Sequence, residues 1–128
     1  APEALIVSEA VDMVVIPGGD GDFGVLPRHA PLVSTVRPGV IVTYEGEGSA
    51  RQPKERIFVA GGFAEVTPDR LTVLAEQAMK VGEIDRAKTE LELKDAAADL
   101  ADAKDAHAKG IAERAVNVAK AKLAAIKA

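Results

Sequence analysis

The distribution of proline, glycine and alanine along the 128 residues is the feature that most constrains the fold. All seven prolines and ten of the eleven glycines lie at or before Gly82, whereas fifteen of the 24 alanines lie after it. Proline and glycine mark turns, and alanine has the highest helix propensity. The sequence therefore predicts two domains, a turn-rich domain over residues 1–82 and a helical domain over residues 83–128.

Short apolar runs rich in β-branched residues, separated by turn residues, fill the first domain. Each run predicts a strand, and these strands are Leu5–Val7, Val11–Ile16, Leu32–Val36, Val40–Tyr44, Ile57–Ala60, Phe63–Val66 and Leu71–Ala75. The segment EVTPDRLTV predicts a hairpin, because Pro68 fixes φ at its turn. Many short strands at this spacing indicate a small antiparallel sandwich or barrel.

The composition of the second domain predicts two helices joined by a short turn. The first begins at Glu83-Ile84-Asp85, where acidic residues suit the positive end of the helix dipole, and runs to about His107. Gly110 is predicted to act as a cap, and a second helix is predicted over about Ile111–Ile126. So short a connection indicates an antiparallel hairpin.

A narrow apolar stripe on each predicted helix indicates how the hairpin packs. The stripes consist of Leu93, Ala97 and Leu100 in the first helix, and of Ala112, Val116, Ala119, Leu123 and Ile126 in the second. Residues 83–107 carry eight acidic and four basic side chains, and residues 111–127 carry one acidic and four basic. Opposite charges favour pairing, but alanine-rich stripes bury little area, so we expect a marginally stable hairpin that can detach.

Composition and charge argue against several classes of function. The net charge of −4 argues against nucleic-acid binding, which is favoured by clustered lysine and arginine. The absence of cysteine excludes disulfides, thiolate metal sites and a cysteine nucleophile. No apolar run reaches the roughly 18 residues of a membrane-spanning helix, so we expect no direct membrane insertion.

The segment PGGDGDFGVLPRHAP, residues 17–31, is the part that most resembles a chemical site. Asp22-Phe23-Gly24 has the letters of a kinase metal-binding motif, but the glycine-rich loop and lysine that must precede it are absent. A phosphate loop would need a lysine and a following helix, and a calcium loop would need more ligands. His29 has no second histidine or cysteine at metal-binding spacing. We therefore predict a turn or contact surface and no catalytic or metal site; a small sandwich enzyme that uses His29 is the alternative.

The order of motifs along the chain resembles the epsilon subunits of bacterial F-type ATP synthases, whose mitochondrial equivalent is called delta. The matching residues are Pro17-Gly18, Gly21, Gly24, Leu26-Pro27, His29-Ala30-Pro31-Leu32, Pro38-Gly39, Gly61-Gly62-Phe63 and Val73-Leu74-Ala75. The resemblance implies an α+β fold, with an antiparallel β-sandwich of about ten strands followed by a C-terminal antiparallel two-helix hairpin. Most members of the family begin with one further strand, so we expect that strand to be missing upstream of Ala1-Pro2-Glu3.

The resemblance also implies the function. Members of this family are non-catalytic subunits of the central rotor stalk, which bind the gamma subunit and the c-subunit ring and need no cofactor. They couple proton flow to ATP synthesis in the alpha and beta subunits. The expected location is the cytoplasmic face of the bacterial inner membrane, or the matrix side of the mitochondrial inner membrane, held peripherally through the complex.

The resemblance assigns contact roles to residues of the glycine-rich segment. Asp20, Gly21 and Asp22 are expected to face the polar loops of the c-ring, where acidic side chains make a charge-complementary contact. His29 and Pro31 are expected to shape the loop and the surface towards gamma.

A regulatory role is the alternative that the resemblance leaves open, because the hairpin of some family members binds ATP or blocks ATP hydrolysis. The candidates for a weak ATP site are Asp85, Lys88 and Arg114. At Lys88 the family has an arginine, whose planar fork lysine lacks. The candidates for inhibitory contacts are Lys120, Lys122 and Lys127. Basic residues near a helix end also suit the dipole, and in some lineages a separate inhibitor protein has taken over inhibition.

Overall fold

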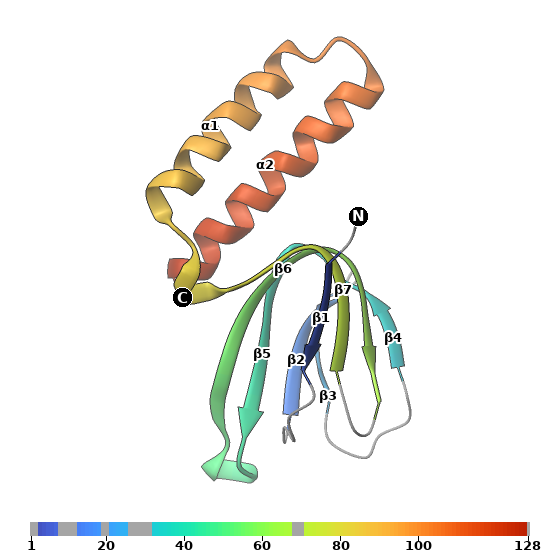
Figure 1. The fold of residues 1–128 in the computed structure, drawn as a ribbon, viewed down its shortest axis with the longest axis vertical. Coiled ribbons are helices and arrows are strands. Elements are labelled where there is room, and N and C mark those ends of the chain that lie inside the picture. Colours follow the sequence, from blue (N-terminus) through green and yellow to red (C-terminus); the bar gives the residue numbers. More distant parts are fainter. Residues whose placement is uncertain (1–2, 8–12, 19–20, 26–31, 68–70, 128) are drawn as a thin grey trace. The chain divides into compact units, whose positions relative to one another are not determined.

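The computed structural model describes residues 3–7, 13–18, 21–25, 32–67 and 71–127 of the chain (Figure 1). The chain divides into two compact units, Ala1–Lys80 and Val81–Ala128, near the change of composition at Gly82. The described part of the first unit contains seven strands and a short 3₁₀ helix, η1, at Gly48–Ala50. The strands are β1 Glu3–Val7, β2 Met13–Gly18, β3 Gly21–Val25, β4 Leu32–Thr35, β5 Gly39–Glu45, β6 Gln52–Val66 and β7 Leu71–Lys80.

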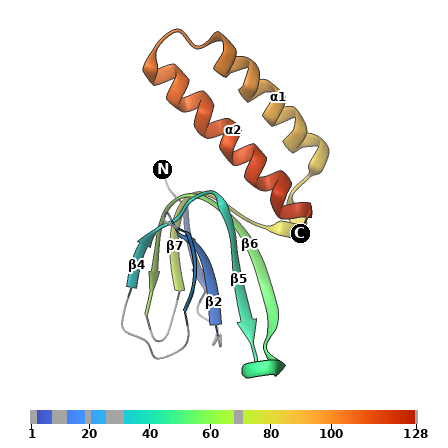
Figure 2. The ribbon, with the colours of Figure 1, turned by 180° about the vertical axis from the view of Figure 1, so that it is seen from behind.

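These strands form one bent antiparallel sheet with the order β1-β7-β6-β5-β2-β3. β4 lies beside the second half of β6, from Leu32↔Val66 to Thr35↔Phe63. The long strands β6 and β7 arch over, so that the sheet folds back on itself as a half-barrel (Figures 1 and 2). The predicted antiparallel sandwich is confirmed, but its count of about ten strands is not, since seven strands occur among the described residues.

All seven predicted strands contribute to this sheet, although two of them form one continuous strand and β3 was not predicted. Ile57–Ala60 and Phe63–Val66 belong to the single strand β6, because both keep pairing with β7 across the intervening glycines. The predicted hairpin between β6 and β7 is present, with Val66 opposite Leu71.

No strand was predicted between Ile16 and Leu32, where Asp20, Gly21 and Asp22 were expected in a turn or contact surface. Gly21–Val25 is strand β3, paired with β2 from Gly18↔Gly21 to Val14↔Val25, so Gly21 and Asp22 lie on a strand. Its glycines and aspartate have low β propensity. Hydrogen bonding to β2 at the edge of the sheet outweighs that propensity.

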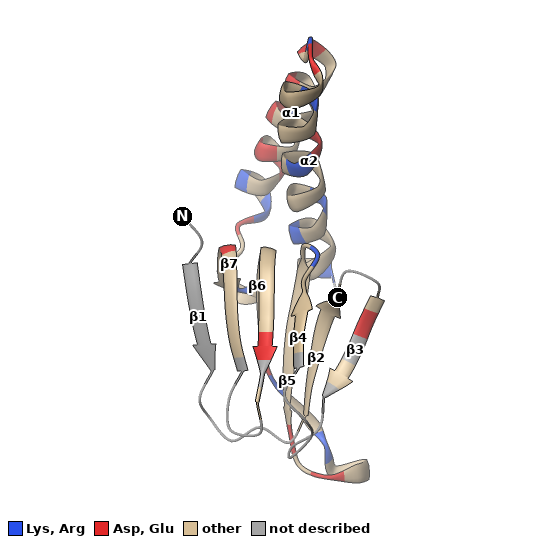
Figure 3. Ribbon diagram, turned by 90° about the vertical axis from the view of Figure 1, so that its right-hand side faces the viewer, with Lys and Arg blue, Asp and Glu red and all other residues tan. Residues whose placement is uncertain are grey.

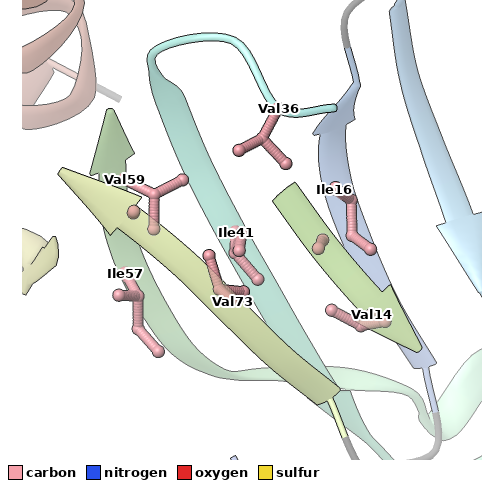
Figure 4. Close-up of a cluster of buried hydrophobic side chains, with 9 residues drawn as sticks. Val14, Ile16, Val36, Ile41, Ile57, Val59 and Val73 are labelled. Atoms are coloured by element: carbon pink, nitrogen blue, oxygen red, sulfur yellow. The ribbon is translucent and has the colours of Figure 1, made fainter. Parts of the chain in front are cut away.

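A cluster of small aliphatic side chains fills the interior of the bent sheet (Figure 4). Its buried members are Val14, Ile16, Val36, Ile41, Ile57, Val59, Ala64, Val73 and Ala75. The low aromatic content of the chain, 3%, is consistent with this cluster of valine, isoleucine and alanine, and Phe58 on β6 is a fully buried aromatic residue outside it.

A pair of glycines allows β6 to pass through the bend. Ile57 and Val59 point into the core before the pair, and Ala64 points into it afterwards. Because side chains alternate along a strand, this odd interval means that the inward face changes once between them. Gly61 and Gly62 have φ angles of 67° and 116°, in a region that glycine adopts readily and other residues rarely do.

The second unit is an antiparallel helical hairpin, as predicted. It contains a 3₁₀ turn, η2, at Val81–Glu83, helix α1 at Arg86–Asp102 and helix α2 at Ala106–Lys127. The Asp85 carboxylate caps α1 by accepting a hydrogen bond from the Lys88 N–H at 2.9 Å. Neither described helix has the combination of length and apolar character that crossing a membrane requires.

The predicted connection between the helices is wrong in position. α1 ends at Asp102 rather than near His107, and Gly110 lies inside α2 instead of capping a helix. Asp105 explains the difference, because its carboxylate accepts from the Ala108 N–H at 2.8 Å. Its carbonyl also accepts from the Lys109 N–H at 3.0 Å. An aspartate N-cap outweighs the cost of a glycine in the second turn.

Opposite stability changes are expected from alanine at these two positions. Asp105→Ala should lower the free energy of unfolding of the hairpin by about 1 kcal/mol, because the Ala108 N–H loses its side-chain acceptor, whereas the backbone carbonyl that accepts from the Lys109 N–H remains. Gly110→Ala should raise it by about 0.7 kcal/mol, since open space surrounds that position. Urea unfolding followed by far-ultraviolet circular dichroism measures both. A destabilising Gly110→Ala would show that Gly110 has the capping role predicted from the sequence.

The buried seam of the hairpin differs by one residue from the predicted stripes. Ala112, Val116 and Ala119 are buried as predicted, but the next buried positions of α2 are Lys122 and Ala125 rather than Leu123 and Ile126. On α1 the buried residues are Thr89 and Ala96, whereas Ala97 is exposed and Leu93 and Leu100 are half-buried. Small residues at these positions let the helices approach closely. The hairpin is thus held by little apolar area, and charged residues recur along both of its helices (Figure 3).

Candidate interaction surfaces

Three large apolar side chains form an exposed patch on the outer face of the sheet. These residues are Val33, Phe63 and Leu74, with 65%, 55% and 45% of their surface exposed, and we call them the apolar patch. Phe63 lies opposite Leu74 on β7 and opposite Thr35 on β4, and Thr35 is two residues from Val33. Because paired and alternate residues share a face, the three side chains lie together.

Sequence reasoning missed the apolar patch, although a signal was present. Ala64, Val73 and Ala75, next to patch residues along β6 and β7, are fully buried in the core. An antiparallel strand that faces water on one side should alternate apolar and polar residues, but here Phe63 and Leu74 interrupt the polar face to which residues such as Glu65 belong. Large apolar side chains gathered on the water-facing side of a small antiparallel sheet indicate that another molecule covers this part of the face.

The end of the β2–β3 pair contains two of the residues expected to face the c-ring. Gly21 and Asp22 both lie exposed on β3, with Gly21 opposite Gly18 (acidic segment of β3 in Figure 3). Asp20, His29 and Pro31 lie outside the described residues, so the predictions made for them remain predictions.

Asp22 forms an ion pair that sequence reasoning did not predict. Arg37 Nη2 donates to Asp22 Oδ1 at 2.5 Å, and Arg37 Nη1 donates to the Gly18 carbonyl at 3.0 Å. Both charged side chains remain about half exposed, at 46% for Arg37 and 59% for Asp22. The surface expected to be acidic is therefore, at Asp22, a paired and locally neutral one.

The three candidates for an ATP site do not come together in this hairpin. The Asp85 carboxylate is used as the cap of α1, next to Lys88. Glu92 and Lys122 lie side by side in this antiparallel pair, so Arg114, eight residues before Lys122, lies near the level of Leu100. That level is twelve residues beyond Lys88, or about 18 Å at 1.5 Å per residue. A site that used all three residues would require a different arrangement of the helices.

The three candidates for inhibitory contacts occupy different environments. Lys120 and Lys127 are exposed on α2. Lys122 is buried in the seam, with 8% of its side chain exposed, and its Nζ lies 3.4 Å from Glu92 Oε2. In this arrangement only the first two present their ammonium groups to another protein.

Comparison with known proteins identifies the class to which this sheet and hairpin belong. The family profile described as "ATP synthase, Delta/Epsilon chain, beta-sandwich domain" matches residues 1–81. The chain belongs to this family. The resemblance read from the glycine-rich motifs is thereby confirmed.

The similar proteins are, more particularly, ATP synthase epsilon chains. The epsilon chain of Rhodospirillum rubrum is 54% identical over 120 residues, covering 88% of this chain and 87% of its own length. That of Paramagnetospirillum magneticum is 48% identical over 126 residues, covering 98% of this chain and 92% of its own. Among solved structures, a chain of the Euglena gracilis mitochondrial ATP synthase (OSCP/F1/c-ring, rotational state 1) matches with a TM-score of 0.72 and 27% identity. That match covers 92% of this chain and 71% of the Euglena chain.

Proposed function

We propose that this chain is a non-catalytic rotor subunit of a proton-translocating F-type ATP synthase. It binds the gamma subunit through the apolar patch and the c-ring through the end of β2 and β3. In this way it couples rotation of the ring to ATP synthesis by the alpha and beta subunits. The complex holds it peripherally at the cytoplasmic face of a bacterial inner membrane, in keeping with its bacterial relatives.

The exposed apolar patch is the observation that carries this proposal. An isolated domain gains nothing from leaving a phenylalanine, a leucine and a valine together in water, whereas a permanent partner buries them favourably. Family membership supplies the partner, because a rotor subunit must be fixed to the shaft that it turns with. The ion-paired end of the β2–β3 pair is polar and suits a wetter contact.

Binding of the full chain to the gamma subunit of the same organism tests the proposal. Phe63→Asp should weaken binding at least tenfold, because it puts an uncompensated carboxylate into the buried interface. Leu91→Asp is the matched control, since Leu91 is an equally exposed apolar residue of α1 and should bind like the wild type. Tyr44 fluorescence establishes that the sheet is folded in the Phe63→Asp variant, and far-ultraviolet circular dichroism establishes that the hairpin is folded in the Leu91→Asp variant.

The outcomes test separately whether gamma is the partner and whether the apolar patch is the surface that binds it. If the wild-type chain does not bind gamma, the proposed function is wrong. If Phe63→Asp binds as tightly as Leu91→Asp, gamma occupies a different face of the sheet.

A second candidate function, regulation of ATP hydrolysis by the hairpin, is favoured by the composition of the seam. Five of its seven buried residues are alanine or valine, and the others are Thr89 and Lys122. So little buried area makes separation of the helices inexpensive, which a switch requires. Deleting residues 81–128 should leave coupled synthesis intact and raise ATP hydrolysis by the assembled enzyme. Unchanged hydrolysis would leave the chain with the coupling role alone.

A further inference from the structure

The end of β2 is fixed to the segment that follows β4. Gly18 forms an antiparallel bridge with Val36, and the Arg37 N–H donates to the Pro17 carbonyl at 2.9 Å. Gly39 passes so close that a Cβ there would lie 2.9 Å from the Pro17 Cβ. The backbone of Arg37 therefore has a defined position beside the end of the β2–β3 pair.

The Arg37 side chain uses this position to span the two strands. One guanidinium nitrogen binds the carbonyl of Gly18, the last residue of β2, and the other binds the carboxylate of Asp22 on β3. Asp22 is the residue of β3 that pairs with Pro17, so the guanidinium joins positions on both strands. The Gly18 carbonyl orients the guanidinium, which holds one oxygen of the Asp22 carboxylate by a charge-assisted hydrogen bond.

One oxygen of Asp22 is left for another molecule. The ion pair uses Oδ1, and no other polar partner of this carboxylate occurs among the described residues. The Asp22 side chain as a whole remains 59% exposed, which leaves room for a second partner. An oriented, half-neutralised carboxylate suits a neutral or singly charged hydrogen-bond donor, such as a side-chain amide, better than a cluster of positive charge.

We propose that Arg37 is a positioning residue for the contact between this chain and the c-ring, acting through Asp22. It holds the carboxylate so that Oδ2 meets a donor on a polar loop of the ring, and it reduces the dependence of that contact on ionic strength. The inference rests on the proposed function, because it takes the ring as the partner of this end of the sheet.

A double-mutant cycle on the assembled gamma–chain complex, binding to detergent-solubilised c-ring, tests this inference. Asp22→Asn and Arg37→Gln should each weaken ring binding at least fivefold. The double variant should be no weaker than either single one, since both remove the same contact. Arg37→Lys should recover part of the loss, because an ammonium retains the charge but not the two-acceptor fork. Lys109→Gln, at an exposed position of α2, is the control for net charge and should bind like the wild type.

Several results would overturn the proposal. One is ring binding by Arg37→Gln that equals the wild type. Another is a loss in the double variant equal to the product of the two single losses, which would mean that Arg37 acts independently of Asp22. A third is a loss of ring binding in Arg37→Gln that Arg37→Lys does not reduce, together with lower stability of the sheet measured by Tyr44 fluorescence. That combination would mean that Arg37 only stabilises the sheet. Gamma binding is measured in parallel and should be unchanged in all variants. If the wild-type chain does not bind gamma, the proposed function itself fails, whereas the three results above overturn only the role of Arg37.

Discussion

Gly62→Ala is expected to destabilise the sheet unit by at least about 3 kcal/mol. The φ angle of Gly62 is 116°, which an alanine adopts only with strain, and the new Cβ would lie 1.7 Å from the Leu74 carbonyl oxygen. That oxygen belongs to the backbone of β7, which pairs with β6 on both sides of this point. Relief would therefore require separation of the two longest strands of the sheet, and core side chains on both would lose their packing.

Two other glycines provide matched controls for the effect at Gly62. Gly61 also has a positive φ, but a Cβ there meets only the flexible Glu76 side chain, at 3.5 Å. Gly48 has a φ of 56° and open space around it. Alanine at either position should cost about 1 kcal/mol, from backbone strain alone.

The chain offers a spectroscopic probe that separates its two units. It has one tyrosine, Tyr44 in β5, and no tryptophan, so tyrosine fluorescence during urea unfolding reports on the sheet. Circular dichroism reports mainly on the helices. A Gly62→Ala variant as stable as Gly61→Ala would contradict the close approach of β6 and β7 at this point.

The fold was largely predictable because its main signals are local. Turn residues and β-branched runs mark six strands of the sheet, and the alanine-rich C-terminal part marks both helices. β3 escaped prediction because its pairing with β2, rather than its own composition, makes it a strand. The helix connection was misplaced because glycine received more weight than Asp105, whose carboxylate caps α2.

The candidate surfaces were less predictable because they depend on contacts between distant segments. Family resemblance predicted a contact role for Asp22 but not its ion pair with Arg37. Arg37 is fifteen residues further along the chain, and the bridge between Gly18 and Val36 brings it next to Asp22. The apolar patch joins residues from three strands, Val33, Phe63 and Leu74, whose common face follows from strand register. Register is a tertiary property that no single run of sequence contains.

Glu92→Leu is expected to destabilise the hairpin by about 2 kcal/mol, the second large effect. Lys122 lies in the seam with 8% of its side chain exposed, so loss of Glu92 leaves a buried ammonium without its partner. The estimate is below that for a fully buried pair, because Glu92 is itself 41% exposed and the lysine can extend towards water.

Lys122→Met should have a much smaller effect or raise stability, because it removes the buried charge and leaves a solvated carboxylate. Thermal unfolding followed by circular dichroism measures both changes, with Glu90→Leu on the exposed face of α1 as the control for helix propensity. Equal losses from Glu92→Leu and Lys122→Met would show that packing of the two stems, not the charge, holds the seam. A loss from Glu92→Leu alone would show that the buried charge of Lys122 makes the hairpin less stable than an apolar residue at that position would. If the hairpin has the proposed regulatory role, Lys122→Met should then also reduce inhibition of ATP hydrolysis, because a tighter hairpin opens less readily.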